Sequence, residues 1–160
     1  MFLKKIKTSI ILILSALMIS NATLCNYAAK TKYQNLINQY PDLKNELRAM
    51  SNYALPVWYT DRDSNSLNTV KDTLQNCDQS TSVIIVFGLP NKDCDAGEST
   101  QGSNKNTNDY LKFITDLHDQ VSNKEIIYIL EPDALSLSIQ NKCGTQNNYI
   151  NNIKQALNIL

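Results

Sequence analysis

Residues 83–87 read VIIVF, a run of apolar and mostly β-branched side chains without polar alternation. A run of this kind predicts a β-strand that is covered on both faces, as the strands of parallel sheets are. Two further apolar runs predict strands at residues 54–59 (ALPVWY) and 125–130 (EIIYIL). Together the runs predict the sheet around which the rest of the chain folds.

Apolar residues at helical spacing fill the segments around these strands. They predict helices at residues 33–50, 63–76, 109–121 and 146–160 and a short helical turn at 134–139. We expect Pro41 to divide the first helix, because proline lacks the backbone donor that a helix interior needs. Strands that alternate with helices predict an α/β fold with a parallel sheet. Because the predicted sheet is small and the chain ends within an amphipathic helix, we expect the fold to be incomplete.

Residues 1–22 have the features of a secretory signal peptide. Lysines precede an apolar stretch at residues 9–19, and small residues lead to Ala22. A membrane anchor and a lipoprotein signal ending at Cys25 are the alternatives, but the apolar stretch is shorter than the roughly 18 residues of a membrane span. We therefore expect a secreted, extracellular protein with its mature domain at residues 23–160 and no membrane partner after cleavage.

The composition narrows the possible partners. The 160-residue chain has 15 basic and 15 acidic residues, and this balance excludes a nucleic-acid partner, which requires a basic surface. One histidine and the lack of a Cys-x-x-Cys motif predict no metal site, and we expect no cofactor. Four cysteines in a secreted protein predict disulfide bonds, but their spacing does not choose among the possible pairings. The complete protein is expected to be a monomer.

Carboxylates follow each predicted strand. Asp61 follows the first strand, Asp93 the second, and Glu131 and Asp133 the third. Functional sites in parallel α/β folds form at the carboxyl ends of the strands, so we expect these groups on one rim. Two carboxylates in one cleft can have their pKa values displaced in opposite directions, which suits glycoside hydrolysis. Taken singly, each aspartate also fits a helix cap or a turn.

Two segments on this rim resemble the signature motifs of a known family. Residues 84–94 (IIVFGLPNKDC) and 127–137 (IYILEPDALSL) resemble those of glycoside hydrolase family 6, secreted cellobiohydrolases and endoglucanases that act on β-1,4-glucan. The resemblance implies the N-terminal half of a distorted parallel (β/α) barrel. It also implies a β-1,4-glucanase that hydrolyses cellulose with inversion and without a cofactor. Activity of this chain alone is not expected, because a full catalytic domain in the family is longer.

The resemblance also implies roles for individual residues. Asp133 resembles the general acid, and Asp93 resembles the neighbouring aspartate that holds the acid's proton in place. The substrate-binding residues that it implies are Tyr59, Asp61, Ser99 and Asn141. A shift of one residue in the comparison gives the role of Tyr59 to Trp58 instead.

The cysteines and one departure complete the comparison with the family. Cys94 and Cys143 match the family's disulfide. Cys25 and Cys77 lie outside that pattern, and the resemblance leaves open whether they pair with each other. Phe87 stands where the family has a tyrosine whose hydroxyl lies under the distorted sugar. This departure favours an alternative, a secreted glucan-binding or interaction protein that keeps the scaffold without catalysis.

Overall fold

The computed structural model describes residues 23–77, 79–121, 124–139 and 142–160. The predicted signal peptide at residues 1–22 lies outside the described residues. Across the described ranges, no helix is long and apolar enough to cross a membrane.

A three-stranded sheet forms the centre of the molecule, with strands in the order β1-β2-β3. The strands are β1 (Val57–Thr60), β2 (Ser82–Phe87) and β3 (Ile126–Leu130). Both pairings are parallel, and Tyr59 lies opposite Val86, which lies opposite Leu130. The predicted α/β fold with a parallel sheet is therefore confirmed.

The helices follow the predicted order with shifted ends. They are α1 (Tyr27–Gln39), the 3₁₀ helix η1 (Pro41–Leu43), α2 (Lys44–Met50), α3 (Ser66–Asn76), α4 (Thr107–Val121), α5 (Ala134–Leu137), α6 (Cys143–Gln146) and α7 (Tyr149–Leu157). Pro41 separates α1 from α2, as expected. The single helix expected at residues 146–160 is wrong at its start, because Asn148 has a φ of 58° and interrupts it. Asparagine tolerates this left-handed conformation better than most residues.

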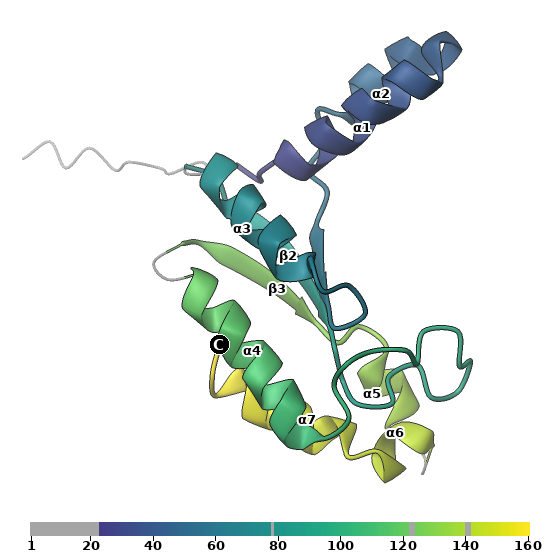
Figure 1. The fold of residues 1–160 in the computed structure, drawn as a ribbon, viewed down its shortest axis with the longest axis vertical. Helices are drawn as coiled ribbons and strands as arrows, with labels where there is room; N and C mark the ends of the chain where they lie inside the picture. The colour runs from purple at the N-terminus through teal and green to yellow at the C-terminus, as the bar shows by residue number, and fades with distance from the viewer. Residues whose placement is uncertain (1–22, 78, 122–123, 140–141) are drawn as a thin grey trace, which may run out of the picture.

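The main core lies on one face of the sheet, where α3 and α4 pack on the strands and α7 lies beside α4 (Figure 1). Val57 and Tyr59 of β1 and Ile84 and Val86 of β2 point into this core. The Tyr59 ring stacks on Phe113 of α4, with ring centroids 4.0 Å apart. Burial of these side chains supplies most of the stabilisation of the fold.

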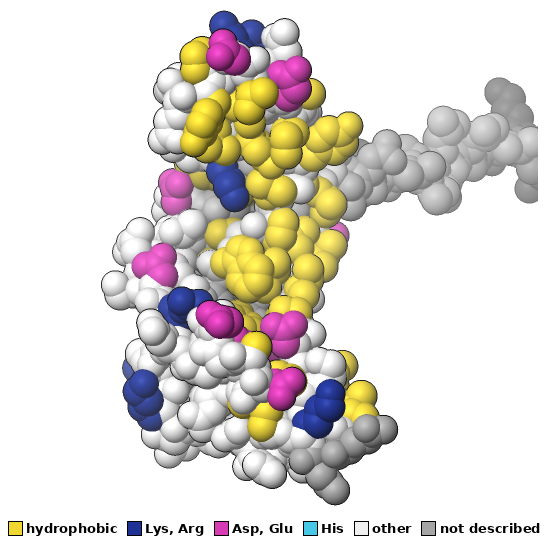
Figure 2. Space-filling view, turned by 90° about the vertical axis from the view of Figure 1, so that its right-hand side faces the viewer, with side chains coloured by type: hydrophobic (Ala, Val, Ile, Leu, Met, Phe, Trp, Pro, Cys, Tyr) yellow, Lys and Arg dark blue, Asp and Glu magenta, His cyan; other side chains and the backbone are white. Residues whose placement is uncertain are grey.

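The other face of the sheet is open. Trp58, Ile127 and Ile129 point to this face and are 51%, 47% and 40% exposed. The prediction of cover on both faces fits β2, whose side chains are nearly all buried. The interpretation of the flanking runs as buried strands is wrong for the outer faces of β1 and β3, because the described helices that contact the sheet cover one side. Figure 2 shows apolar side chains gathered along the hollowed side of the molecule.

The hairpin of α1 and α2 extends away from the sheet (Figure 1). It has a small core of its own, formed by Ala29, Tyr33 and Leu47. The Cys25–Cys77 disulfide attaches the hairpin to the end of α3. The sequence left the pairing of these two cysteines open, and the structure joins them to each other.

Candidate active site

A hollow of about 400 Å³ lies at the carboxyl ends of the strands, on the open face of the sheet. It is lined by Trp58, Thr60, Arg62, Phe87, Ser99 and Asp133. The rings of Trp58 and Phe87 meet edge to face, with centroids 6.1 Å apart. An apolar aromatic wall with polar groups at its rim is typical of a site that binds a small molecule or a sugar.

Asp133 belongs to this hollow and is exposed. It occupies the N-cap position of α5, but its side chain makes no capping hydrogen bond. The reading of Asp133 as an ordinary helix cap is therefore not supported. Within the described ranges its carboxylate has no hydrogen-bond donor, which leaves it available to a ligand.

Asp93 is held by the loop that follows β2. Its φ is 53°, and its Oδ2 accepts a hydrogen bond from the backbone N–H of Ser99 at 2.7 Å. The Ser99 hydroxyl in turn accepts a hydrogen bond from Arg62 Nη1 at 3.2 Å. Asp93 thus orients Ser99, which lines the hollow together with Asp133. The Cys94–Cys143 disulfide, present as the resemblance implied, ties this loop to α6.

Tyr59 does not reach the hollow. Its side chain is 3% exposed, and its hydroxyl donates a hydrogen bond to the Phe113 carbonyl at 2.9 Å. Adjacent residues of a strand point to opposite faces, so Trp58 faces the hollow while Tyr59 faces the core. The expected contact between Tyr59 and a substrate does not fit this burial, whereas Trp58, the alternative that a one-residue shift provides, lines the hollow.

Asp61 is also unavailable to a ligand. Its side chain is fully buried, and Oδ1 accepts a hydrogen bond from Lys92 Nζ at 2.6 Å. Its Oδ2 accepts the backbone N–H of Asn104 at 2.8 Å. Direct contact with substrate, the expected role, does not fit this geometry, because both oxygens hold protein groups. Asn141, the remaining expected residue, lies outside the described residues.

Glu131 is buried, whereas the sequence suggested that it lies on the exposed rim. Its side chain is 2% exposed, and Oε1 accepts the backbone N–H of Gly88 at 2.8 Å. Burial raises the pKa of Glu131 to about 7, although hydrogen bonds from the backbone of Gly88 and Leu89 oppose this rise. Glu131 had been expected only as one carboxylate of the rim, with no role of its own, and Arg62 had not been expected at the site. Their signal in the sequence was their position within two residues of the end of a strand.

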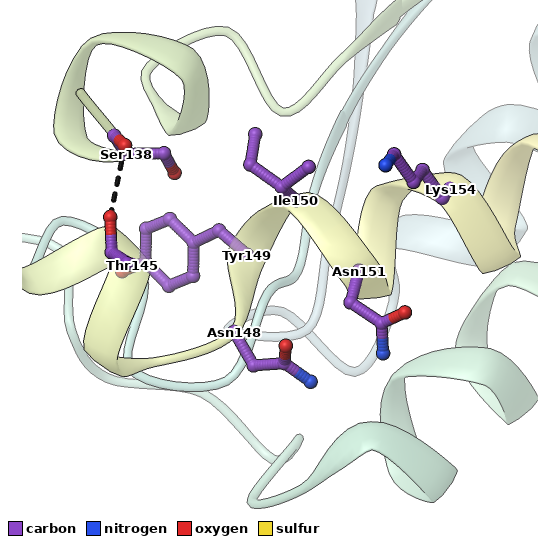
Figure 3. Close-up of a pocket in the computed structure, with 7 residues that line it drawn as sticks. All are labelled: Ser138, Thr145, Asn148, Tyr149, Ile150, Asn151 and Lys154. Carbon is purple, nitrogen blue, oxygen red and sulfur yellow. Dashed lines mark hydrogen bonds between the residues drawn. The ribbon is translucent and has the colours of Figure 1, made fainter.

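A second hollow of about 280 Å³ lies against α5, α6 and α7 (Figure 3). Its lining is Ser138, Thr145, Asn148, Tyr149, Ile150, Asn151 and Lys154. It contains hydroxyl, amide and amine groups but no carboxylate, so it lacks a pair for acid–base chemistry. The Tyr149 hydroxyl donates to the carbonyl of Asn91 and so links α7 to the loop that carries Asp93.

A family model described as glycosyl hydrolases family 6 matches residues 19–160. The chain belongs to this family. No curated protein sequence matches the chain. The motifs that carried the resemblance lie on the rim of the hollow, at the ends of β2 and β3.

Solved structures of family 6 enzymes share the fold. The cellobiohydrolase Cel6A from Humicola insolens, in complex with a cellobio-derived isofagomine, is 20% identical with a TM-score of 0.69, and the match covers 88% of this chain and 44% of that one. CcCel6C from Coprinopsis cinerea is 16% identical with a TM-score of 0.70 over 89% and 45%. The chain thus spans less than half the length of these structures. Its fold corresponds to part of a distorted parallel (β/α) barrel.

Proposed function

We propose that the protein is a secreted β-1,4-glucanase that hydrolyses cellulose-type chains with inversion at the anomeric carbon. The observation that carries this proposal is the hollow in which Asp133, free of a capping bond, faces the aromatic wall of Trp58 and Phe87. Family membership and the cellobio-derived ligand of the Humicola relative support a β-1,4-linked substrate.

In the proposed reaction, Asp133 donates its proton to the glycosidic oxygen as the bond to the anomeric carbon breaks. Water adds to that carbon from the opposite face and releases a proton to a base. Asp93 orients Ser99 through its backbone N–H, and Ser99 contacts the sugar. We assign this base to no described residue.

Substrate binding rests on the aromatic wall. A pyranose presents apolar C–H groups on its faces, and these stack on aromatic rings. Trp58 is half-exposed at the hollow and is the residue we propose for this contact. We further propose that residues 23–160 supply the acid side of the cleft and that the rest of a full-length catalytic domain supplies the opposite wall. Export is supported by the two disulfides.

Hydrolysis and its stereochemistry test the proposal. The full-length protein is incubated with cellohexaose, and the new reducing ends are followed by proton NMR. Inversion releases the α anomer first, before mutarotation. Release of the β anomer, or failure to cleave β-1,4-glucan, would overturn the proposed reaction.

Binding has a separate measurement in the 160-residue chain. Trp58 is its only tryptophan, so the fluorescence of the chain reports directly on the hollow. Cello-oligosaccharides are expected to change this emission, and the Trp58→Phe variant is expected to bind them more weakly in calorimetry. The matched control is Tyr53→Phe, since Tyr53 is 73% exposed and lies outside the lining of the hollow. An equal loss in both variants would contradict the assignment.

Phe87 favours a second candidate function, a glucan-binding protein without catalysis. The Phe87 ring has no hydroxyl to place under a distorted sugar. Together with Trp58, which it meets edge to face, it offers a sugar only an apolar surface. This candidate predicts the same fluorescence change without any hydrolysis by the full-length protein. Phe87→Tyr then becomes informative, because a rise in hydrolysis in that variant would show that the missing hydroxyl limits catalysis.

A further inference from the structure

Glu131 lies only two residues before Asp133, yet it points in the opposite direction. Its side chain is buried under the hollow, whereas that of Asp133 is exposed at the rim. The backbone turns between them because Glu131 has a φ of 49°, a left-handed conformation that is unfavourable for a residue with a Cβ. Such a conformation persists only where the surroundings hold it.

The surroundings hold Glu131 at several atoms. Its N–H donates to the Val86 carbonyl at 2.9 Å, and its carbonyl accepts the N–H of Ala134 at 3.0 Å. Its Oε1 accepts the Gly88 N–H. The side chain therefore joins the end of β3, which carries Asp133, to the end of β2, which leads to Asp93.

Gly88 extends this connection to β1, the remaining strand. Its carbonyl accepts a hydrogen bond from Asn104 Nδ2 at 2.7 Å, and Asn104 donates its own N–H to Asp61. A Cβ at Gly88 would lie 2.5 Å from the Phe113 ring, so only glycine fits here. A continuous buried network thus links the ends of all the strands beneath the hollow.

Two atoms of this network have no hydrogen-bond partner among the described residues, namely Glu131 Oε2 and the Tyr110 hydroxyl. They lie near one another, and each affects the pKa of the other group. The titratable and charged groups that face Glu131 are Tyr110 from α4, Lys92 from the loop after β2 and Tyr149 from α7. Burial of this carboxyl is costly, but an apolar side chain in its place would leave the buried Gly88 N–H without its acceptor, so the contribution of Glu131 lies in that bond.

We propose that Glu131 is a positioning residue that, through its bond to Gly88, sets where Asp133 lies relative to the loop carrying Asp93. The inference rests on the proposed function, because the position of Asp133 matters only if it donates a proton to a sugar. The bond strengthens when the carboxyl ionises, since a charged acceptor makes the stronger hydrogen bond.

The bond itself is testable without any enzymatic activity. The chain has four glycines, so a chain labelled with ¹⁵N-glycine gives a spectrum simple enough to follow Gly88 alone. The Gly88 amide proton is expected to move downfield with a midpoint near pH 7 in the wild type and to show no such titration in Glu131→Gln. The control is Glu125→Gln, an exposed glutamate just before β3. A Gly88 amide that titrates identically in all these proteins would overturn the proposal.

The consequence for Asp133 has its own measurement in the same chain. Labelling with ¹³C-aspartate follows the side-chain carboxyls, and Asp133→Asn identifies the signal of Asp133. Glu131→Ala is expected to move the carboxyl signal of Asp133 at a fixed pH relative to the wild type, and Glu125→Ala is expected to leave that signal in place. An unmoved Asp133 signal in Glu131→Ala would overturn the positioning role, whether or not the protein is an enzyme.

Kinetics of the full-length protein complete the test. The expected order of kcat is wild type, then Glu131→Gln, then Glu131→Ala, with a loss of at least tenfold in the last and KM within twofold throughout. The amide in Glu131→Gln keeps an oxygen that accepts a hydrogen bond from Gly88. Because this amide does not ionise, the variant should also lose the limb near pH 7 from the pH profile of kcat. Unchanged kcat in both folded variants contradicts the inference, whereas a wild type that cleaves no glucan contradicts the proposed function and leaves the two NMR measurements to decide the role of Glu131.

Discussion

The two faces of the sheet carry similar side chains but have different surroundings. On the covered face, Ile84 and Val86 are completely buried beneath α3 and α4. On the open face, Trp58 and Ile129 remain about half-exposed, and the hollow with Asp133 lies at the end of this face. The comparison separates the part of the molecule that stabilises the fold from the part that is available to a ligand.

The largest effect is expected on the open side, from Asp133→Asn. The substitution removes the proton that the leaving oxygen needs, and general acid catalysis contributes about 10²- to 10⁴-fold to a rate. Hydrolysis by the full-length protein should fall by that factor, while glucan binding and the melting temperature stay unchanged. Asp95→Asn is the control, because Asp95 is exposed in the loop after β2. Cellulose turnover at the wild-type rate by Asp133→Asn would contradict the assignment of the catalytic acid to the open side of the sheet.

Removal of either disulfide is expected to lower stability equally, but only one of the two removals is expected to affect glucan binding. Cys94–Cys143 and Cys25–Cys77 close loops of similar length, with sequence separations of 49 and 52. The chain-entropy model gives about 4 kcal/mol for each. Replacing either pair with serines should lower the free energy of unfolding by a similar amount. Glucan binding should weaken only without Cys94–Cys143, which holds the loop that orients Ser99.

Both double-serine variants can be compared by urea unfolding and by calorimetry with cellotetraose. Equal losses of binding would show that the two disulfides act only through global stability. In that case the loop carrying Asp93 would not depend on its own bridge.

A matched pair of core substitutions tests the comparison directly. Ile84→Ala removes a buried side chain from the covered face, and such truncations cost about 2–5 kcal/mol. Ile129→Ala removes the same group from the open face, where Ile129 is 40% exposed, and should cost about 1 kcal/mol or less. Denaturant unfolding measures both values. A cost for Ile129→Ala as large as that for Ile84→Ala would mean that the open face is covered in solution.

A pH dependence of stability is expected from Glu131. Its pKa is raised to about 7 in the folded protein from an ordinary value of 4.5. The folded state therefore holds the proton more tightly, and stability falls as the pH rises from about 4.5 to 7. The fall amounts to about 3 kcal/mol, and above pH 7 it is complete. Unfolding of the wild type and of Glu131→Gln across this range measures it.

The Glu131→Gln variant should lack this part of the pH dependence, and Glu125→Gln should keep it. If the wild type and Glu131→Gln lose stability in parallel between pH 4.5 and 7, the buried carboxyl is not the cause.

The sequence predicted the strands, their parallel arrangement and the helical order because apolar periodicity is a local property of the chain. It also predicted that Asp93 and Asp133 follow neighbouring strands, and parallel pairing then brings such residues to one edge of the sheet. The Cys94–Cys143 disulfide followed from the family motifs and not from spacing, whereas the Cys25–Cys77 pairing was left open by the sequence and was decided by the structure. The predicted features are encoded by residues close together in the chain or by recognisable segments.

The tertiary structure alone decided which side of each strand is covered. Trp58 and Tyr59 are neighbouring aromatic residues, and the two-residue period of a strand shows only that they face opposite sides. The positions of α3 and α4 place Tyr59 in the core and Trp58 in the hollow. In the same way, Asp61 and Glu131 follow strands just as Asp133 does, but they are buried and bonded beneath the site. The physical reason is that burial depends on which distant segments pack against a residue, and these contacts are not encoded in its local sequence.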